Sequence, residues 1–244
     1  QGLIGPYLYL GYPDVTHLSP YIFLWIVIVS LISGLLGSGM SKVILLLIKW
    51  KNSFKKTSYL VFFAIGAGLI IALLGFFIHE DVFGSGKELM TNALFTNDKY
   101  IPWYIPMLKT VGLALTFSTG GAGGVFAPSL AAGAGVGSML AGWLQLSDSN
   151  TNLLILSGMV GFLTGVTRSP FTSAILVLEM TDRHNVIFHL MLAGMIASII
   201  SRLVDSHSLY DRLKVQYMGR LLQKEFTEEE MEMREEEEED LHAG

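Results

Sequence analysis

The feature that most constrains this chain is a succession of apolar segments separated by breaks that contain glycine and proline. The first segment, Tyr21–Ile48, exceeds the stretch of about 20 residues that crosses a bilayer, so we expect it to tilt. A second segment of spanning length, Tyr59–Ile78, follows a short loop that holds four lysines. Because positively charged loops stay in the cytoplasm, we expect the first span to run inward and the second outward.

Several of the later hydrophobic segments are shorter than a bilayer is thick. They comprise a short amphipathic helix at Lys87–Phe95, segments at Pro102–Phe117, 126–144 and Leu153–Val166, a helix from Pro170 to Met180, a further span at Val186–Leu203 and a terminal helix at 208–224. Interrupted helices occur inside a membrane only where they are buried in protein or line a water-filled path. The pattern therefore predicts an all-α polytopic membrane protein of the transporter or channel type, with short and re-entrant helices.

Charge is distributed unevenly along the sequence. Charged residues make up 15% of the chain, yet eleven of the 21 acidic residues fall in 225–240 beside a single basic one. We expect 223–244 to be a disordered acidic tail in the cytoplasm, with calcium or partner binding as the alternative role. The turn-rich stretch 1–19 is interpreted as an outer-side lead-in to a membrane domain at 20–222. The sequence contains no cysteine, which excludes disulfides and thiol chemistry.

A glycine-rich run at 118–130 marks the most distinctive break between apolar segments. Four of the five residues from Gly120 to Gly124 are glycines, and Pro128 follows at a position suited to the first turn of a helix. The pattern indicates a flexible loop that leads into a helix N-terminus within an apolar region. The amide groups at such a terminus point outward and carry the positive end of the helix dipole, so they can bind a small anion without a basic side chain.

Three stretches resemble the CLC family of chloride channels and chloride/proton antiporters. The run Gly123-Gly124-Val125-Phe126-Ala127-Pro128, preceded by Phe117–Gly120, is similar to the third signature loop of that family. The stretch Arg168–Asp182 resembles another patterned CLC segment, and Ser208-Leu209-Tyr210 resembles the start of the last CLC helix. The three stretches occur in the family's order, and the resemblance covers roughly 20–222.

The resemblance implies a CLC-type inverted repeat, of which this chain holds the second repeat and the terminal helix. It also implies a homodimer in which each subunit has its own pore, with Ser169–Met180 and Val186–Leu203 at the interface. In the family, a central chloride is bound by backbone amides and by a tyrosine hydroxyl. The matching amides are those of Val125 and Phe126, and the matching hydroxyl is that of Tyr210. The surrounding selectivity-filter motif is Gly124, Val125, Phe126, Ala127 and Pro128.

Two further signature loops of the family are absent from this sequence. One supplies a serine ligand through Gly-Ser-Gly-x-Pro, and the other supplies the gating glutamate through Gly-Lys/Arg-Glu-x-Pro. The run Gly37-Ser38-Gly39 lacks the proline and lies within a spanning segment, so we interpret it as small-residue helix packing. The chain also begins with Gln1 rather than methionine. We therefore expect the first half of the subunit upstream or as a separate chain.

The function that these features predict is anion transport across a membrane, most directly chloride/proton antiport. A passive chloride channel of the voltage-gated type is the first alternative, and a non-transporting membrane fragment or scaffold is the second. No enzyme activity and no cofactor are expected, because neither of the common phosphate-binding glycine motifs occurs. The predicted partners are chloride, protons in the case of an antiporter, and the lipid bilayer. No regulatory domain pair is visible after 222, which favours a bacterial-type protein of the inner membrane.

Four polar residues inside the predicted membrane domain need separate interpretations. We expect Glu179 to form a structural ion pair with Arg168 or Arg183, although a part in a proton path is the alternative. Lys109 is expected to snorkel, with its ammonium reaching water. His184 and His189 are five residues apart and so do not share a helix face, and no metal site is predicted.

Overall fold

The computed structural model describes residues 9–54, 56–120 and 123–219, and all regular structure in these ranges is helical. This confirms the predicted all-α class. The residues up to Ser208 form one compact unit, and those from Leu209 onward form a second, which contains a helical stretch at 209–219. The helices of the first unit are α1 (Ile22–Asn52), α2 (Thr57–Phe77), η1 (Glu80–Val82), α3 (Lys87–Phe95), α4 (Tyr104–Thr119), α5 (Phe126–Trp143), α6 (Asp148–Thr167), α7 (Pro170–Thr181), η2 (His184–Val186) and α8 (Ile187–Val204).

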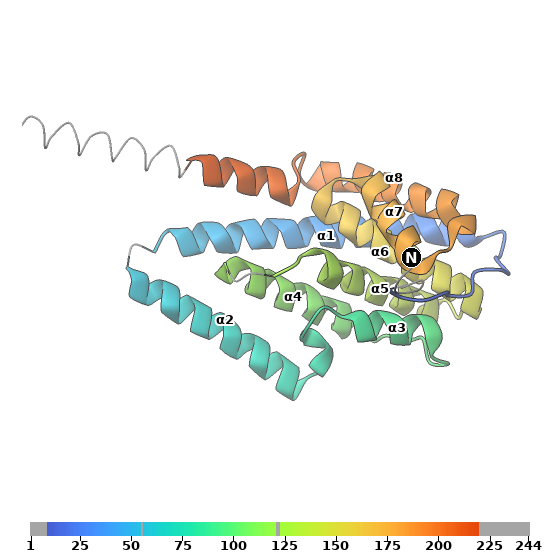
Figure 1. Ribbon diagram of the computed structural model, residues 1–244, viewed down its shortest axis with the longest axis horizontal. Coiled ribbons are helices and arrows are strands. Elements are labelled where there is room, and N and C mark those ends of the chain that lie inside the picture. The colour runs from blue at the N-terminus through green and yellow to red at the C-terminus, as the bar shows by residue number, and fades with distance from the viewer. Residues whose placement is uncertain (1–8, 55, 121–122, 220–244) are drawn as a thin grey trace, which may run out of the picture. The chain divides into compact units, whose positions relative to one another are not determined.

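Helix α6 is the centre of the first unit and packs against α1, α5, α7 and α8 (Figure 1). Its contact with α5 brings backbone against backbone. A Cβ atom added to Gly158 would lie 2.3 Å from the carbonyl oxygen of Gly133, and one added to Gly137 would lie 2.4 Å from that of Leu154. Helices in a membrane associate largely through such close packing, because lipid provides little hydrophobic drive.

Helix α1 lies against α6 in the same manner. A Cβ atom on Gly37 would lie 2.3 Å from the carbonyl oxygen of Phe162, and one on Gly165 would lie 2.6 Å from that of Gly34. The hydroxyl of Ser38 donates a hydrogen bond of 3.3 Å to the carbonyl of Ser201 in α8. The interpretation of the 37–39 run as helix packing is therefore confirmed for Gly37 and Ser38, whereas a Cβ atom on Gly39 would meet nothing within 4 Å.

Helix α6 is longer than predicted. The sequence indicated a short apolar segment at Leu153–Val166, but the helix begins at Asp148 and has 20 residues. The reason is that polar side chains of its first turn are bonded to the N-terminal segment that precedes α1. The Oδ1 of Asn150 accepts a hydrogen bond of 3.0 Å from the amide of Ser19, and the Nδ2 of Asn152 donates one of 2.8 Å to the carbonyl of Asp14.

Four helical segments have the length and hydropathy to cross a membrane: α1, α2, α6 and the η2–α8 segment at 184–204. Helices α4, α5 and α7 lie between them in the chain. Of these, α4 has 16 residues and α7 has 12. Helix α7 begins at Pro170, which occupies the first helical position, where a missing amide proton has no cost. The predicted mixture of spanning and shorter helices is thus present.

Candidate anion site at the start of α5

The chain is broken between α4 and α5 at the predicted glycine-rich loop. Helix α4 ends at Thr119, and its C-cap, Gly120, has a φ of +86°, in the left-handed region that favours glycine. A Cβ atom on Gly123 or Gly124 would meet nothing within 4 Å. The backbone of these two exposed glycines is therefore accessible from several directions.

Helix α5 begins at Phe126, directly after this loop. Val125 is the N-cap, and the first intrahelical hydrogen bond runs over 3.1 Å from the amide of Ser129 to the carbonyl of Val125. The amides of Phe126 and Ala127 belong to the first turn, so they point out of the helix along its axis. Pro128 also lies in this turn and has no amide proton. The run Gly124–Pro128 thus contains a helix N-terminus, as predicted.

A cavity of about 380 Å³ opens beside this helix start. One wall is formed by Gly123, Gly124, Ala127 and Pro128. The opposite walls come from α4, from Ile71 of α2 and from the turn at 82–85. The loop and the first turn of α5 therefore border an open volume rather than a fully packed core.

Lys109 of α4 lines the same cavity, and the prediction that it snorkels is wrong. Its side chain is almost fully buried, with 1% of its surface exposed. The ammonium donates hydrogen bonds of 2.7, 2.7 and 3.0 Å to the carbonyls of Asp81, Phe83 and Gly84. The turn at 81–84 folds over α4 and supplies these acceptors, so the ammonium does not need to reach water.

Tyr210, the other predicted chloride ligand, is the second residue of the helical stretch 209–219. It belongs to the second compact unit, whereas Val125 and Phe126 belong to the first. Its part as an anion ligand stays a prediction. The acidic tail 223–244 lies outside the described residues.

The predicted ion pairs of Glu179 are also wrong. Glu179 is exposed on α7, and the two arginines considered as its partners bind backbone carbonyls instead. The guanidinium of Arg183 donates a hydrogen bond of 3.0 Å to the carbonyl of Tyr12, and that of Arg168 binds the carbonyl of Asp205.

The two histidines near α8 have separate surroundings. His184 lies 3.2 Å from the carboxylate of Asp182, whereas the ring of His189 stacks on that of Phe23 at a centroid distance of 4.9 Å. Within the described ranges, no group of three or more histidine, aspartate or glutamate side chains is placed to hold a metal ion.

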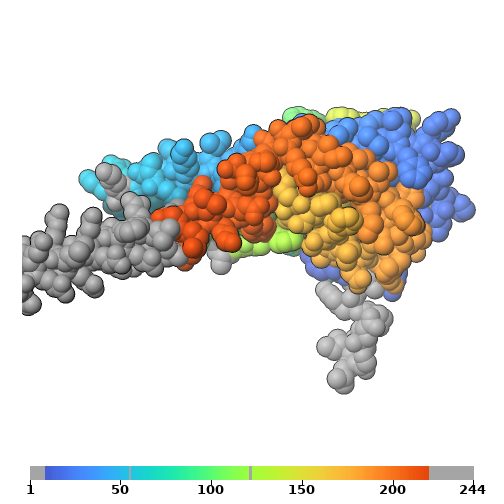
Figure 2. Space-filling model, turned by 90° about the horizontal axis from the view of Figure 1, so that it is seen from above, coloured from blue at the N-terminus to red at the C-terminus, as the bar shows by residue number. Residues whose placement is uncertain are grey.

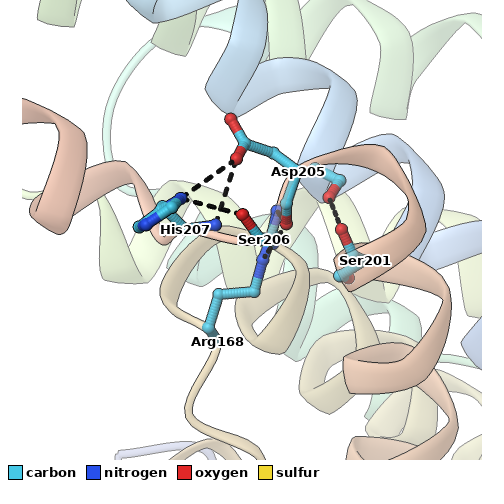
Figure 3. A network of polar contacts seen from close by, with 6 residues as sticks. Arg168, Ser201, Asp205, Ser206 and His207 are labelled. Carbon is cyan, nitrogen blue, oxygen red and sulfur yellow. Dashed lines mark hydrogen bonds and ion pairs between the residues drawn. The ribbon is translucent and has the colours of Figure 1, made fainter.

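A polar network around Arg168 escaped the sequence analysis (Figure 3). It connects the end of α6 with the segment that follows α8. The side chain of Arg168 donates to carbonyls of Gly165 and Asp205, and Asp205 in turn bonds to Ser201 and His207. The only sequence signal was an arginine directly before Ser169-Pro170, which alone does not identify its acceptors.

Comparison with known proteins identifies the family of the chain. The family model described as "Voltage gated chloride channel" matches residues 1–202. Among curated proteins, the chain is 30% identical over 148 residues to the voltage-gated ClC-type chloride channel ClcB of Salmonella typhimurium, covering 59% of this chain and 35% of the relative. It is 34% identical over 149 residues to ClcB of Escherichia coli O81, with the same coverage of both chains. The matches thus span about a third of the length of these curated relatives.

Solved structures show the same fold. A CLC-type fluoride/proton antiporter matches with a TM-score of 0.69 and 23% identity, over 83% of this chain and 49% of that one. A slow cyanobacterial Cl−/H+ antiporter matches with a TM-score of 0.63 and 23% identity, over 79% of this chain and 48% of that one. Because the family model covers most of the sequence and the architecture agrees, this chain belongs to the voltage gated chloride channel, or CLC, family.

Proposed function

We propose that this chain provides the second half of a CLC subunit and that anions cross the membrane past the start of α5. The observation that carries the proposal is the break between α4 and α5, which presents a helix N-terminus to a cavity lined by Gly123 and Gly124. Helix N-termini bind anions through outward-pointing amides. The bacterial origin of the similar ClcB proteins supports a place in the bacterial plasma membrane.

The proposed chloride ligands are the amides of Val125 and Phe126 and the hydroxyl of Tyr210. Lys109 contributes a nearby positive charge, but the three carbonyls around its ammonium take up its hydrogen bonds. Direct contacts to the anion are therefore left to neutral donors. Neutral donors hold an anion less strongly than a salt bridge does, so the ion can also leave, as transport requires.

The first half of the subunit is the proposed partner of the exposed side of α2. This helix is strongly apolar, yet only Ala67 and Gly75 are buried along its length. Exposed apolar surface of this extent requires lipid or further protein as a neighbour. The similar antiporter structures are about twice as long as the part that matches, which supports a protein neighbour. We propose that it is supplied upstream in the same polypeptide or by a separate chain.

A homodimer is proposed at the face formed by α7 and α8. The two helices lie beside each other on one side of the first unit (Figure 2). Large apolar side chains are exposed along both helices, although lipid could cover this face as well. They are Phe171, Ile175, Phe188, Met195, Ile199 and Leu203.

Reconstitution into liposomes tests the proposed transport. The protein, expressed from its complete reading frame, is expected to release chloride from loaded vesicles. For an antiporter, the reversal potential moves when a pH gradient is imposed at fixed chloride. For a channel, which the names of the ClcB relatives favour, it does not move. Vesicles that hold correctly folded protein but release no chloride would contradict the proposal and support a non-transporting scaffold.

Tyr210→Phe is expected to weaken chloride binding about tenfold, because loss of one hydrogen bond to a charged group costs about 1.5 kcal/mol. Isothermal titration calorimetry on purified protein measures the affinity. Tyr217→Phe is the matched control, since Tyr217 is an exposed tyrosine of the same helical stretch. Unchanged affinity in the Tyr210 variant would remove Tyr210 from the site.

A further inference from the structure

The turn that connects η1 to α3 lies between two cavities. One is the cavity beside the start of α5, and the other is a second cavity of about 580 Å³ that borders α3. Phe83, Gly84 and Ser85 line both of them. The turn follows α2, so it lies at the end of that helix opposite the lysine loop, which the charge pattern predicts to be cytoplasmic. The second cavity is therefore expected on the outer side of the membrane.

Lys109 holds this turn from the neighbouring helix α4. Its ammonium donates hydrogen bonds to the carbonyls of Asp81, Phe83 and Gly84, and 1% of the surface of Lys109 is exposed. A buried charge without partners is costly, so the ammonium favours the arrangement that keeps all three acceptors. The turn and the lysine therefore stabilise each other in a single closed arrangement.

Two glycines of the turn have left-handed backbones. Gly84 has a φ of +64°, and Gly86, the N-cap of α3, has a φ of +77°. A residue with a Cβ atom is strained in this conformation, whereas glycine is not. A Cβ atom on Gly84 would meet nothing within 4 Å. A substitution at Gly84 therefore strains the closed turn without displacing a neighbour and without removing Lys109.

The second cavity carries an excess of acidic side chains. Its charged and titratable lining consists of Glu80, Asp81 and Glu88 together with one lysine, Lys87, and one histidine, His79. Such an excess of carboxylates attracts cations and repels anions. On this side, a chloride ion would meet both an unfavourable potential and the closed turn.

We propose that the turn at 81–86 closes the outer end of the anion path and that Lys109 is the positioning residue that keeps it closed. The inference rests on the proposed function, because the cavity that the turn closes is the one beside the start of α5. When the turn opens, the two cavities become continuous and outer water reaches Gly123 and Gly124. Lys109 acts through the turn and needs no contact with the anion.

The test places a cysteine at Leu113, which lines the cavity beside α5 and has 8% of its surface exposed. The printed sequence contains no cysteine, and any others in the complete reading frame are replaced by serine. A membrane-impermeant thiol reagent is applied to one side of oriented vesicles at a time. A thiol that is reached only through brief openings reacts in proportion to the population of the open state.

Two variants are expected to speed up modification from the outer side alone. Lys109→Met removes three hydrogen bonds to the turn, and we expect an increase on the order of 100-fold. Gly84→Ala strains the turn and keeps the lysine, and we expect an increase of about tenfold. In both variants a cationic reagent is expected to react faster than an anionic one, because the outer cavity is acidic.

The matched controls are Lys42→Met, at an exposed lysine of α1, and Gly39→Ala, at a glycine whose Cβ atom would meet nothing within 4 Å. Both are expected to keep the wild-type rate of modification. A wild-type rate in folded Gly84→Ala protein, or equal acceleration from both sides of the membrane, overturns the inference. Acceleration from the outer side in a protein that moves no chloride would support the barrier and contradict the proposed function alone.

Discussion

Gly158→Val is expected to prevent folding, because the new side chain would occupy the place of the α5 backbone. Even a single Cβ atom at this position would lie 2.3 Å from the carbonyl oxygen of Gly133 and 3.1 Å from the amide nitrogen of Gly137. Backbone atoms cannot rotate away as a side chain can, so α5 and α6 must separate. Overpacking of a core costs about 3 kcal/mol at the upper end of the usual range, which is a large part of the stability of a typical domain.

The effect is measured as the yield of monodisperse protein and its thermal transition temperature in detergent. Gly39→Val is the matched control, since a Cβ atom on Gly39 of α1 would meet nothing within 4 Å. Gly39→Val is expected to change the free energy of unfolding by about 0.5 kcal/mol or less. A Gly158→Val protein that is monodisperse and has the transition temperature of the wild type would show that the backbones of α5 and α6 are not in contact.

Lys109→Met is expected to lower the free energy of unfolding by about 3 kcal/mol. Methionine keeps the length of the side chain but removes all three hydrogen-bond donors. The carbonyls of Asp81, Phe83 and Gly84 then lose their partner. Because these carbonyls belong to a single turn, the loss is expected to loosen that turn most.

Two measurements follow the Lys109 variant. The thermal transition temperature reports the overall loss, and hydrogen exchange is expected to become faster over 81–84. Lys42→Met on the exposed side of α1 is the control for the loss of a lysine. If the two variants had equal transition temperatures, the hydrogen bonds of Lys109 would make no net contribution to the stability of the fold.

The helices of this fold follow from the sequence because their signals are local. Pro170 marks the start of α7 and Gly120 the end of α4, and the apolar runs between such breaks correspond to the observed elements. The start of α6 was missed because Asp148 and the four residues after it are polar. Their helical conformation depends on hydrogen bonds to residues more than 130 positions earlier, such as Asp14, and no local pattern reports those.

The candidate site divides in the same way. The start of α5 could be predicted because the glycines and Pro128 encode the conformation of the loop itself. The surroundings of Lys109, Glu179 and Arg168 could not be predicted, because sequence reasoning pairs charges with opposite charges. In this fold, both Lys109 and Arg168 bind backbone carbonyls at the ends of helices or in turns. Every residue type carries such a carbonyl, so its position becomes known only with the fold.

If anions cross as proposed, the interruption between α4 and α5 would also determine where a transmembrane voltage acts. On the proposed anion path, water that enters the cavity beside Gly123 and Gly124 would carry the high dielectric constant of the bulk into the membrane. The electric field would then be concentrated over the short remaining distance around the start of α5. One elementary charge that crosses the full potential gains about 2.3 kcal/mol per 100 mV. An anion that moves past Phe126 would therefore experience a large share of the membrane potential within a few ångströms.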